Sequence, residues 1–365
     1  MNRKVKMKHI AAMAGVSVMT VSRVVNGKPG VSQETRQRIL KLIREFNYIS
    51  DPIATSLQKQ ETSTFGIIMP LSHQNDSYWE LSLAGMEAAV REVSHFNINL
   101  RYYQYDRYLE DSYVKSYTRA IYDNNDGLLI APVLSRLAED HFKAEPPQVP
   151  YVLFDADIPD CEKLSFIGQD SYAGGMTAGK LMSILVQSSG ELAVIKIAPA
   201  DYHINVRAAG FQSYFDDHPL IDIQTYNLPN LEVVDVFDKL VIRMIDENRD
   251  LKGIFVPNAS TYHFAHALSS LNLPERIFLI GYDLIRENIS CLQQGSIDFI
   301  INQQPIRQGY EGIMALYNQI ILKKTIQREK LLPVEIVTRE NLHTFSDHHD
   351  QYHSNLPDPL VATAG

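Results

Sequence analysis

The stretch Ile10-Ala-Ala-Met-Ala-Gly-Val-Ser-Val-Met-Thr-Val-Ser-Arg-Val-Val-Asn26 places a glycine between two short apolar patterns. Apolar side chains recur at helical spacing over residues 7–14 and again over residues 18–26, which predicts two short helices. Gly15 can adopt the positive φ of a tight turn, and Ser17 can cap the helix that follows. Two short helices around such a turn predict a helix-turn-helix module.

Charge sets this N-terminal segment apart from the rest of the chain. Residues 1–60 contain 11 Lys and Arg against 3 Asp and Glu, a net charge of +8, whereas the remainder carries −17. A third helix is predicted from its capping residue Ser32 to Phe46, again with apolar residues on one face. A solvated basic tail would not need that apolar pattern. The segment is therefore predicted to contact a polyanion, and the acidic body is not.

From Phe65 onward, short apolar runs alternate with amphipathic stretches. Strand and helix alternating at this spacing predict an α/β fold with parallel sheets covered by helices. About 280 residues follow this pattern, enough for two lobes with a ligand cleft between them. The predicted strands are 65–69, 97–103, 127–130, 151–154, 192–197, 223–226, 253–256 and 278–281. The predicted helices include 81–94, 174–186, 208–215, 234–248 and 262–271.

Four regions follow from these patterns. Residues 1–50 form the helix-turn-helix domain, and Asp51-Pro52 ends it because a residue before proline is pushed out of the α region. Residues 51–62 are a short, polar, helix-competent hinge. Residues 63–344 form the two-lobed effector-binding and dimerisation domain. Residues 345–365, polar and rich in histidine and proline, are predicted to be a disordered tail.

Several functional classes are not expected. Cys161 and Cys291 are far apart and are predicted to be free thiols of a reduced, cytoplasmic protein. The apolar run at residues 10–21 is diluted by hydroxyl residues and closed by Arg23, so we expect neither a signal peptide nor a membrane span. The histidines of the tail lack the spacing of a metal site. No phosphate-binding loop or GxSxG motif occurs, and we expect neither catalysis nor a cofactor.

Residues 10–26, together with Val31-Ser-Gln-Glu-Thr-Arg36 and Phe46-Asn-Tyr-Ile-Ser-Asp-Pro52, resemble the LacI (lac repressor/GalR-type) family of bacterial regulators. The resemblance extends over residues 5–342 and is strongest in the first 60. It implies a homodimer that binds double-stranded operator DNA, acts as a repressor, and responds to a small polar effector such as a sugar. Lys6 and His9 depart from the family's usual residues at the first helix, and both add positive charge.

The resemblance also implies how DNA is bound. The helix at residues 18–26 would enter the major groove, with Arg23 bonding guanine and Val18 and Met19 making apolar contacts with bases. The alternative for Val18 and Met19 is that they are core residues. Leu57 matches the leucine that the family inserts into the minor groove. The remaining predicted DNA contacts are to phosphates, from Ser17, Thr20, Ser22 and Lys28.

The body resembles periplasmic sugar-binding proteins, as it does throughout the family. Tyr78 and Trp79 match an aromatic pair that stacks on sugar rings, and Asp155 matches an acid that holds sugar hydroxyls. Carboxylates, amides and a guanidinium at strand ends suit the hydroxyls of a polyol. For each acid alone, a solvated loop carboxylate is the alternative. The other positions that match the ligand site are Asp76, Asp170, Arg207, Asn258, Asp283 and Gln304.

Two other functions share parts of this pattern. A periplasmic solute-binding protein that feeds a transporter would have the same cleft, but it has no use for the basic helical segment of residues 1–60. An enzyme would need catalytic motifs that the sequence does not show. A transcription regulator accounts for both the basic segment and the α/β body.

Overall fold

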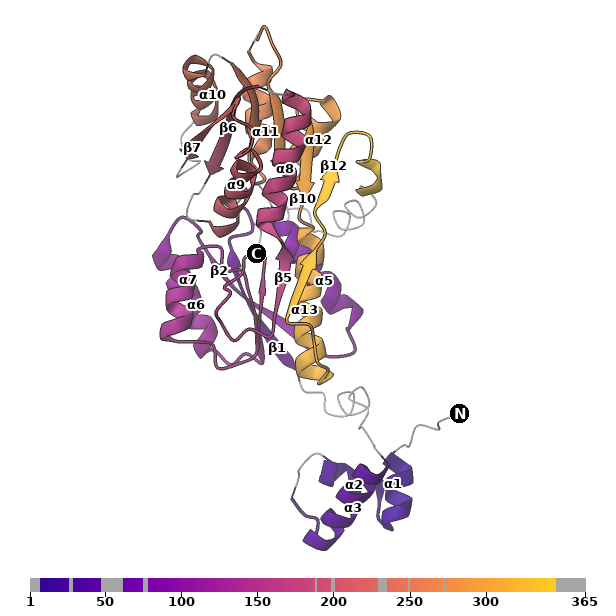
Figure 1. Cartoon of the computed structure of the whole chain (residues 1–365). Coiled ribbons are helices and arrows are strands. Elements are labelled where there is room, and N and C mark those ends of the chain that lie inside the picture. The colour runs from indigo at the N-terminus through magenta and orange to yellow at the C-terminus, as the bar shows by residue number, and fades with distance from the viewer. Residues whose placement is uncertain are drawn as a thin grey trace, which may run out of the picture. The chain divides into compact units, whose positions relative to one another are not determined.

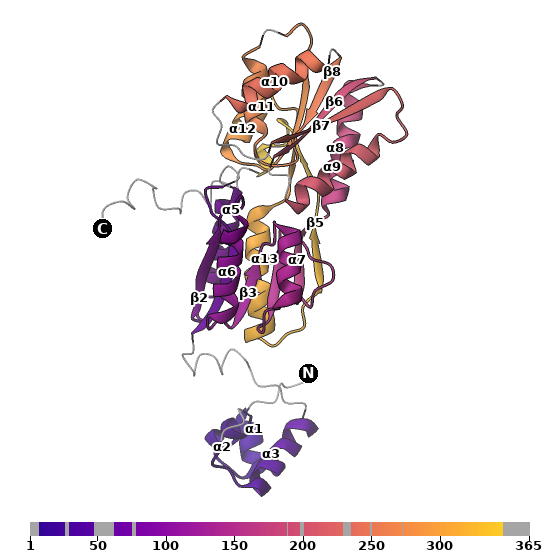
Figure 2. The ribbon, with the colours of Figure 1, turned by 90° about the vertical axis from the view of Figure 1, so that its left-hand side faces the viewer.

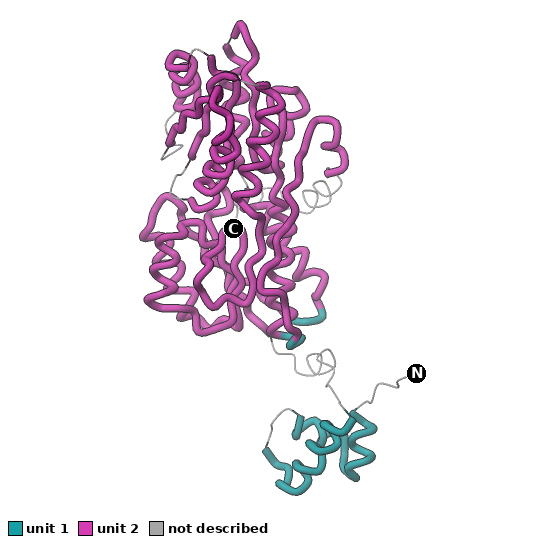
Figure 3. The backbone as a smooth tube through the Cα atoms, viewed as in Figure 1, with its two compact units in different colours: residues 1–62, 95–97, 321–323 teal, residues 63–94, 98–320, 324–365 magenta. Residues whose placement is uncertain are grey.

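The computed structural model divides the chain into two compact units. One consists of residues 1–62 with two short segments, 95–97 and 321–323, and the other holds the rest (Figure 3). Nearly all of the predicted hinge and tail lies outside the described residues. The residues that the structure describes are 7–25, 29–46, 62–74, 78–187, 189–197, 201–228, 235–248, 250–271 and 273–345.

The N-terminal unit contains the three predicted helices: α1 (Met7–Ala14), α2 (Val18–Val25) and α3 (Gln33–Glu45). Gly15, in the turn between α1 and α2, has φ +66°, the conformation that the pattern predicts there. Ser32 caps α3, and its hydroxyl accepts a hydrogen bond from the Thr35 backbone N–H at 3.3 Å. The core of this unit comprises Ile10, Ala11, Ala14, Val21, Val24 and Ile39.

The larger unit contains two lobes, each built on a six-stranded sheet (Figure 1). In the first lobe the strand order is β11-β5-β4-β3-β1-β2, and all neighbouring pairs are parallel. Helices α5 (Tyr78–Glu92) and α13 (Pro305–Leu316) pack together on one face, and α6 (Glu110–Tyr122) and α7 (Ser135–Ala144) lie on the other (Figure 1). A π-helix, η1 (Tyr317–Ile321), continues α13. The strands are β1 (Ser63–Pro70), β2 (Ile98–Tyr105), β3 (Gly127–Ile130), β4 (Tyr151–Phe154), β5 (Ser165–Gln169) and β11 (Glu329–Leu332).

The second lobe has the strand order β12-β10-β9-β8-β6-β7, and only the β10–β12 pair is antiparallel. Figure 2 shows α8 and α9 on one side of its strands and α10, α11 and α12 on the other. The helices are α8 (Ser171–Val186), α9 (Tyr202–Tyr214), α10 (Val236–Glu247), α11 (Thr261–Ser269) and α12 (Arg286–Gln294). The strands are β6 (Gly190–Ile197), β7 (Ile221–Leu228), β8 (Leu251–Phe255), β9 (Phe278–Tyr282), β10 (Phe299–Asn302) and β12 (Glu335–Val337).

The chain crosses between the lobes three times: from β5 to α8, from β10 to α13, and from β11 to β12. One side chain ties the three crossings together. Gln169, 4% exposed, donates from Nε2 to the carbonyl oxygens of Asn302 and Pro333, each at 3.1 Å. Because each bonded group lies on a different crossing, this amide holds the three segments side by side.

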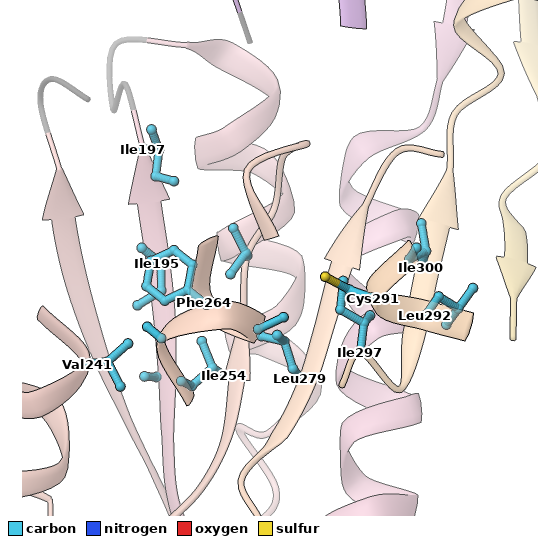
Figure 4. Close-up of a cluster of buried hydrophobic side chains, with 14 of the residues drawn as sticks. Ile195, Ile197, Val241, Ile254, Phe264, Leu279, Cys291, Leu292, Ile297 and Ile300 are labelled. Carbon is cyan, nitrogen blue, oxygen red and sulfur yellow. The ribbon is translucent and has the colours of Figure 1, made fainter. Parts of the chain in front are cut away.

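Apolar side chains between the second sheet and α10–α12 form a continuous core (Figure 4). It includes Ile195, Ile254, Phe264 and Leu279, all fully buried. Cys291 lies in the same core as a free thiol, and Cys161 is also unpaired by any disulfide, as the sequence predicts. In the part of the chain that the structure describes, no helix combines the length and apolar character needed to cross a membrane.

Helix α9 is held unusually close to α8 by glycine. A Cβ atom added at Gly175 of α8 would lie 2.0 Å from the carbonyl oxygen of Arg207 on α9. Only a residue without a side chain permits that approach. Gly175 therefore fixes the backbone position of the turn of α9 that carries Arg207.

Candidate functional site

Helix α2 presents two apolar side chains to solvent. Val18 is 48% exposed and Met19 is 70% exposed, whereas Val21 and Val24 are buried in the core of the N-terminal unit. The alternative that Val18 and Met19 are core residues is therefore wrong. Arg23 also lies on the exposed surface of the helix. An exposed arginine and two exposed apolar side chains on one helix are groups that can contact base edges in a major groove.

The hydroxyl side chains of the same turn have a local role as well. Ser17 accepts a hydrogen bond from the Thr20 backbone N–H at 3.1 Å, and the two hydroxyl oxygens lie 2.9 Å apart. Ser17 therefore caps α2, as predicted. Lys28 and Leu57 lie outside the described residues, so their predicted DNA contacts stay predictions, as do those of the whole helix.

In the larger unit, ten polar and aromatic side chains meet between the two lobes, each no more than 3% exposed. We call this set the interlobe cluster. Full burial of so many ionisable groups is costly unless they pair with one another or with a ligand. Four members come from the first lobe (Tyr78, Trp79, Arg107 and Asp155) and six from the second lobe and its crossings (Asp201, His203, Arg207, Asn258, Asp283 and Gln303).

The first-lobe part of the interlobe cluster is centred on Asp155. The Tyr78 hydroxyl donates to Asp155 Oδ1 at 2.7 Å, and the Trp79 ring meets the Tyr78 ring edge to face with centroids 5.0 Å apart. From the other lobe, His203 Nδ1 lies 3.5 Å from Asp155 Oδ2. Arg107 forms an ion pair with Asp201, also across the lobes. His203 Nε2 lies 4.0 Å from Asp201 Oδ2, so neighbouring polar groups connect Tyr78 to Arg107.

The second-lobe part is centred on Arg207. Its guanidinium donates to the Pro257 carbonyl at 3.0 Å and to Gln303 Oε1 at 2.6 Å, and it lies 4.0 Å from the centroid of the Tyr282 ring. Gln303 in turn donates from Nε2 to Asp283 Oδ1 at 3.0 Å. Asn258 follows Pro257 directly and is 2% exposed.

Asp155 and Asp283 occupy corresponding places in the two lobes. Each directly follows a central strand, β4 or β9, and each has a left-handed backbone, with φ of +66° and +70°. Such a conformation is unfavourable for residues other than glycine and is concentrated at functional sites. The left-handed turn aims each carboxyl group into the interlobe cluster instead of along its strand.

Burial controls the protonation of these groups. It raises the pKa of the Asp283 carboxyl to about 7, against the opposing effect of the Arg207 charge. It also raises the pKa of Asp155, although the hydrogen bond from Tyr78 works in the other direction. Burial, helped by the positive charges of Arg207 and Arg107, holds the pKa of His203 well below its usual range. His203 is therefore neutral at physiological pH.

Several polar atoms of this region have no hydrogen-bond partner among the residues that the structure describes. They include Trp79 Nε1, Arg207 Nε and the Tyr282 hydroxyl, together with Asp155 Oδ2 as an acceptor. Buried polar groups of proteins are nearly always satisfied. Because donors and acceptors both lack partners here, a ligand carrying hydroxyl groups would satisfy both kinds.

Two predicted effector residues lie elsewhere. Asp170 is exposed at the start of α8, where it accepts from the Ala173 N–H at 2.9 Å and so caps the helix. Gln304 donates to the Pro333 carbonyl at 3.3 Å in a crossing, and its neighbour Gln303 takes the place in the cluster. Asp76 lies outside the described residues. The sequence did not indicate Arg107, Asp201 and His203 at all.

A cavity of about 610 Å³ lies away from the interlobe cluster and includes none of its residues. It is lined largely by α13 and the crossings, with Glu92, Arg307 and Glu311 among its polar groups. Its polar lining ranges from the exposed Glu92 and Arg307 to the buried Asn302, and it includes no buried side-chain atom without a partner. Buried donors and acceptors without partners are therefore found in the cluster and not in the lining of this cavity.

The raised pKa of Asp283 predicts a measurable pH dependence. Its folded-state pKa of about 7 lies above the ordinary 3.8, so the folded protein holds the proton more tightly and loses stability as pH rises from 4 through 7. Asp283→Asn removes this loss. Relative to the wild type, the variant is expected to gain about 2–3 kcal/mol in free energy of unfolding between pH 5 and pH 8. Urea unfolding followed by Trp79 fluorescence measures it, and a pH-independent difference would contradict the assignment.

Comparison with protein families matches residues 6–51 to "Bacterial regulatory proteins, lacI family" and residues 65–324 to "Periplasmic binding protein domain". These matches and the two units described above define a transcription regulator with a DNA-binding helix-turn-helix and a binding-protein-like body. The HTH-type transcriptional regulator IdnR of Escherichia coli is 34% identical over 291 residues, covering 77% of this chain and 82% of its own. The chain belongs to the LacI family.

A further relative matches most of the chain. The sucrose operon repressor of Streptococcus mutans is 24% identical over 357 residues, covering 92% of this chain and 99% of its own. Among solved structures, a LacI transcriptional regulator from Bacteroides fragilis has a TM-score of 0.71 and 27% identity, covering 78% of this chain and 99% of its own. A solute-binding protein from Burkholderia graminis in complex with D-arabinose shares the fold, with a TM-score of 0.66 and 19% identity over 77% of this chain and 96% of its own.

Proposed function

We propose that this protein is a cytoplasmic, homodimeric repressor that binds operator DNA through α2 and is controlled by a sugar bound in the interlobe cluster. The observation that carries the proposal is the combination of two sites in one chain. One is the exposed set Val18, Met19 and Arg23 on a basic N-terminal unit. The other is the buried interlobe cluster, with unsatisfied donors and acceptors. Relatives named for the sucrose and ribose operons support a sugar as the effector.

The burial of the interlobe cluster dictates how an effector would bind. Its members are at most 3% exposed, so a ligand can reach them only when the lobes part. Closure on the ligand then favours one lobe angle over another. The predicted hinge at residues 51–62 leads directly into β1 of the first lobe at Ser63. A change in lobe angle would thereby reach the hinge and the DNA-binding unit.

The direct test is an operator-binding assay on the full chain and on a chain lacking residues 1–60. The full chain is expected to retard DNA carrying its operator, and the shortened chain is expected to bind none while still binding effector. A full chain that binds no DNA, even with effector present, would favour the solute-binding function instead. The assay needs a fixed salt concentration, because phosphate contacts make the affinity strongly salt-dependent.

A homodimer is expected because one helix-turn-helix reads too few base pairs to define a genomic site. Two copies on a near-palindromic operator would double the number of bases read. Sedimentation at micromolar concentration is expected to give twice the monomer mass of 41.4 kDa. Monomers alone, with and without operator, would overturn this part of the proposal.

Arg23→Ala is expected to weaken operator binding by about 1–3 kcal/mol, because a bidentate bond to guanine is lost. The loss falls on one base position in each half-site, where the preference relaxes. Lys28→Ala is the matched comparison: as a phosphate contact, it weakens binding to all sequences alike and reduces the salt dependence. Titration of both variants against operator and scrambled DNA separates them, and an identical sequence-selective loss would contradict the assignment.

A further inference from the structure

The interlobe cluster holds two guanidinium groups, and both are already occupied. Arg107, 3% exposed, is paired across the lobes with Asp201, which is fully buried. The terminal nitrogens of Arg207 donate hydrogen bonds to the Pro257 carbonyl and to Gln303, and the guanidinium lies over the Tyr282 ring. Among the guanidinium nitrogens of Arg207, Nε has no hydrogen-bond partner in the described part of the chain.

The cluster contains three buried carboxyl groups for its two guanidinium cations. Asp155 and Asp283 follow β4 and β9, Asp201 precedes α9, and all three are buried in the same cluster. His203 bridges two of them, with Nε2 at 4.0 Å from Asp201 Oδ2 and Nδ1 at 3.5 Å from Asp155 Oδ2. Burial keeps the pKa of His203 low, so its ring adds no positive charge at neutral pH. The cluster has no surplus of positive charge to offer a ligand.

We infer, resting on the proposed function, that the effector is an uncharged monosaccharide and that Asp201 makes the site reject sugar acids and sugar phosphates by neutralising Arg107. A neutral hydroxyl donates to Asp155 Oδ2 and accepts from Arg207 Nε or Trp79 Nε1, which satisfies both kinds of unpartnered atom. An anionic ligand would bring a further negative charge among buried carboxyl groups. The charges of Arg107 and Arg207 already offset those of Asp201, Asp283 and Asp155.

The wild-type test compares matched ligands by calorimetry at pH 7.5. The neutral set is D-galactose, D-glucose, D-ribose and D-fructose, and the charged set is the corresponding uronates and phosphates. Methyl galacturonate controls for size, because it has the bulk of galacturonate without its charge. For the sugar that binds, we expect a Kd at least tenfold lower than that of its charged counterpart. A uronate or phosphate that binds more tightly than its neutral parent overturns this inference and leaves the sugar-sensing function standing.

Asp201→Asn tests the role of the ion pair. The substitution leaves the Arg107 charge without its carboxylate, so the ratio of charged to neutral affinity is expected to rise at least tenfold. Adding Arg107→Gln removes the excess charge and is expected to restore the wild-type ratio. Asp216→Asn, an exposed change of the same charge beyond α9, is the control and is expected to change nothing. An unchanged ratio in folded Asp201→Asn overturns the role of Asp201.

Sugar sensing and selectivity against charged sugars can each be absent without the other explaining it. If no member of either ligand set binds, the sugar-sensing function itself falls, and this inference falls with it. If Asp201→Asn does not fold, the matched ligands on the wild type still decide the charge class. If methyl galacturonate is rejected as strongly as galacturonate while galactose binds, the selectivity comes from size, and the electrostatic role of Asp201 is overturned.

Discussion

Replacing Arg207 by alanine is expected to cost about 3–5 kcal/mol of folding free energy and to abolish effector binding. Arg207 is fully buried, and its charge offsets those of Asp283 and Asp155. Removing one partner of a buried charged network leaves the others uncompensated in a medium that solvates them poorly. The variant also leaves Gln303 Oε1 and the Pro257 carbonyl without their donor. The loss combines charge, hydrogen bonds and packing on Tyr282.

Urea unfolding of the larger unit, followed through Trp79 fluorescence, measures this effect. Trp79 is the only tryptophan of the chain and lies in the interlobe cluster, so the signal comes from the lobes and not from the N-terminal unit. Arg286→Ala is the matched control, because Arg286 is exposed on α12 of the same lobe. It is expected to change stability by less than ~0.5 kcal/mol. If Arg207→Ala and Arg286→Ala lower the free energy of unfolding equally, Arg207 does not stabilise the interlobe cluster.

Asp283→Ala is expected to abolish the effect of sugar on operator binding while leaving sugar-free operator binding close to that of the wild type. The carboxyl group is an acceptor between the lobes, and the DNA-binding unit lies in a separate part of the chain. In the wild type, effector is expected to change operator affinity by about 5–150-fold, the range of a 1–3 kcal/mol coupling. The same factor must appear when operator DNA changes sugar affinity.

Leu57→Gly is expected to impair operator binding and not sugar binding, the reverse of Asp283→Ala. If Leu57 wedges into the minor groove as the sequence predicts, this variant loses operator affinity and keeps its sugar affinity measured without DNA. Asp160→Ala, an exposed carboxylate of the first lobe, controls for the loss of one negative charge. DNA titration with and without sugar on the three variants tests the scheme. If sugar changes the operator affinity of Asp283→Ala as much as that of the wild type, the scheme is wrong.

The helix-turn-helix could be predicted in detail because its evidence is local. The apolar spacing, the turn glycine and the capping serines each act within a few residues, and α1, α2 and α3 occupy the expected stretches. Elements with weaker patterns were not predicted. The edge strands β11 and β12 contain charged residues and have one buried residue each, so neither forms an apolar run. Helix α6 is largely polar, with only three buried residues in thirteen.

The interlobe cluster could be predicted only in part. Acids directly after strands, such as Asp155 and Asp283, follow a general rule for ligand sites in parallel sheets. Arg107 and Asp201 also follow strands, β2 and β6, and the same rule extended by a few residues would have found them. Choosing Gln304 over Gln303 is an error of one residue. It depends on the left-handed φ of +59° at Gln304, which a sequence pattern does not reveal.

The triple crossing tied by Gln169 means that neither lobe is a continuous piece of the gene. The first lobe is assembled from β1–β5, α13 and β11, with the whole of β6–β10 inserted between them. A chain that ends before β11 therefore cannot supply a finished first lobe. A protease that cuts one crossing leaves two covalent links in place. The two lobes are expected to persist or to be degraded together. Proteolysis in the cell is then expected to remove both lobes together and to leave no folded single-lobe fragment.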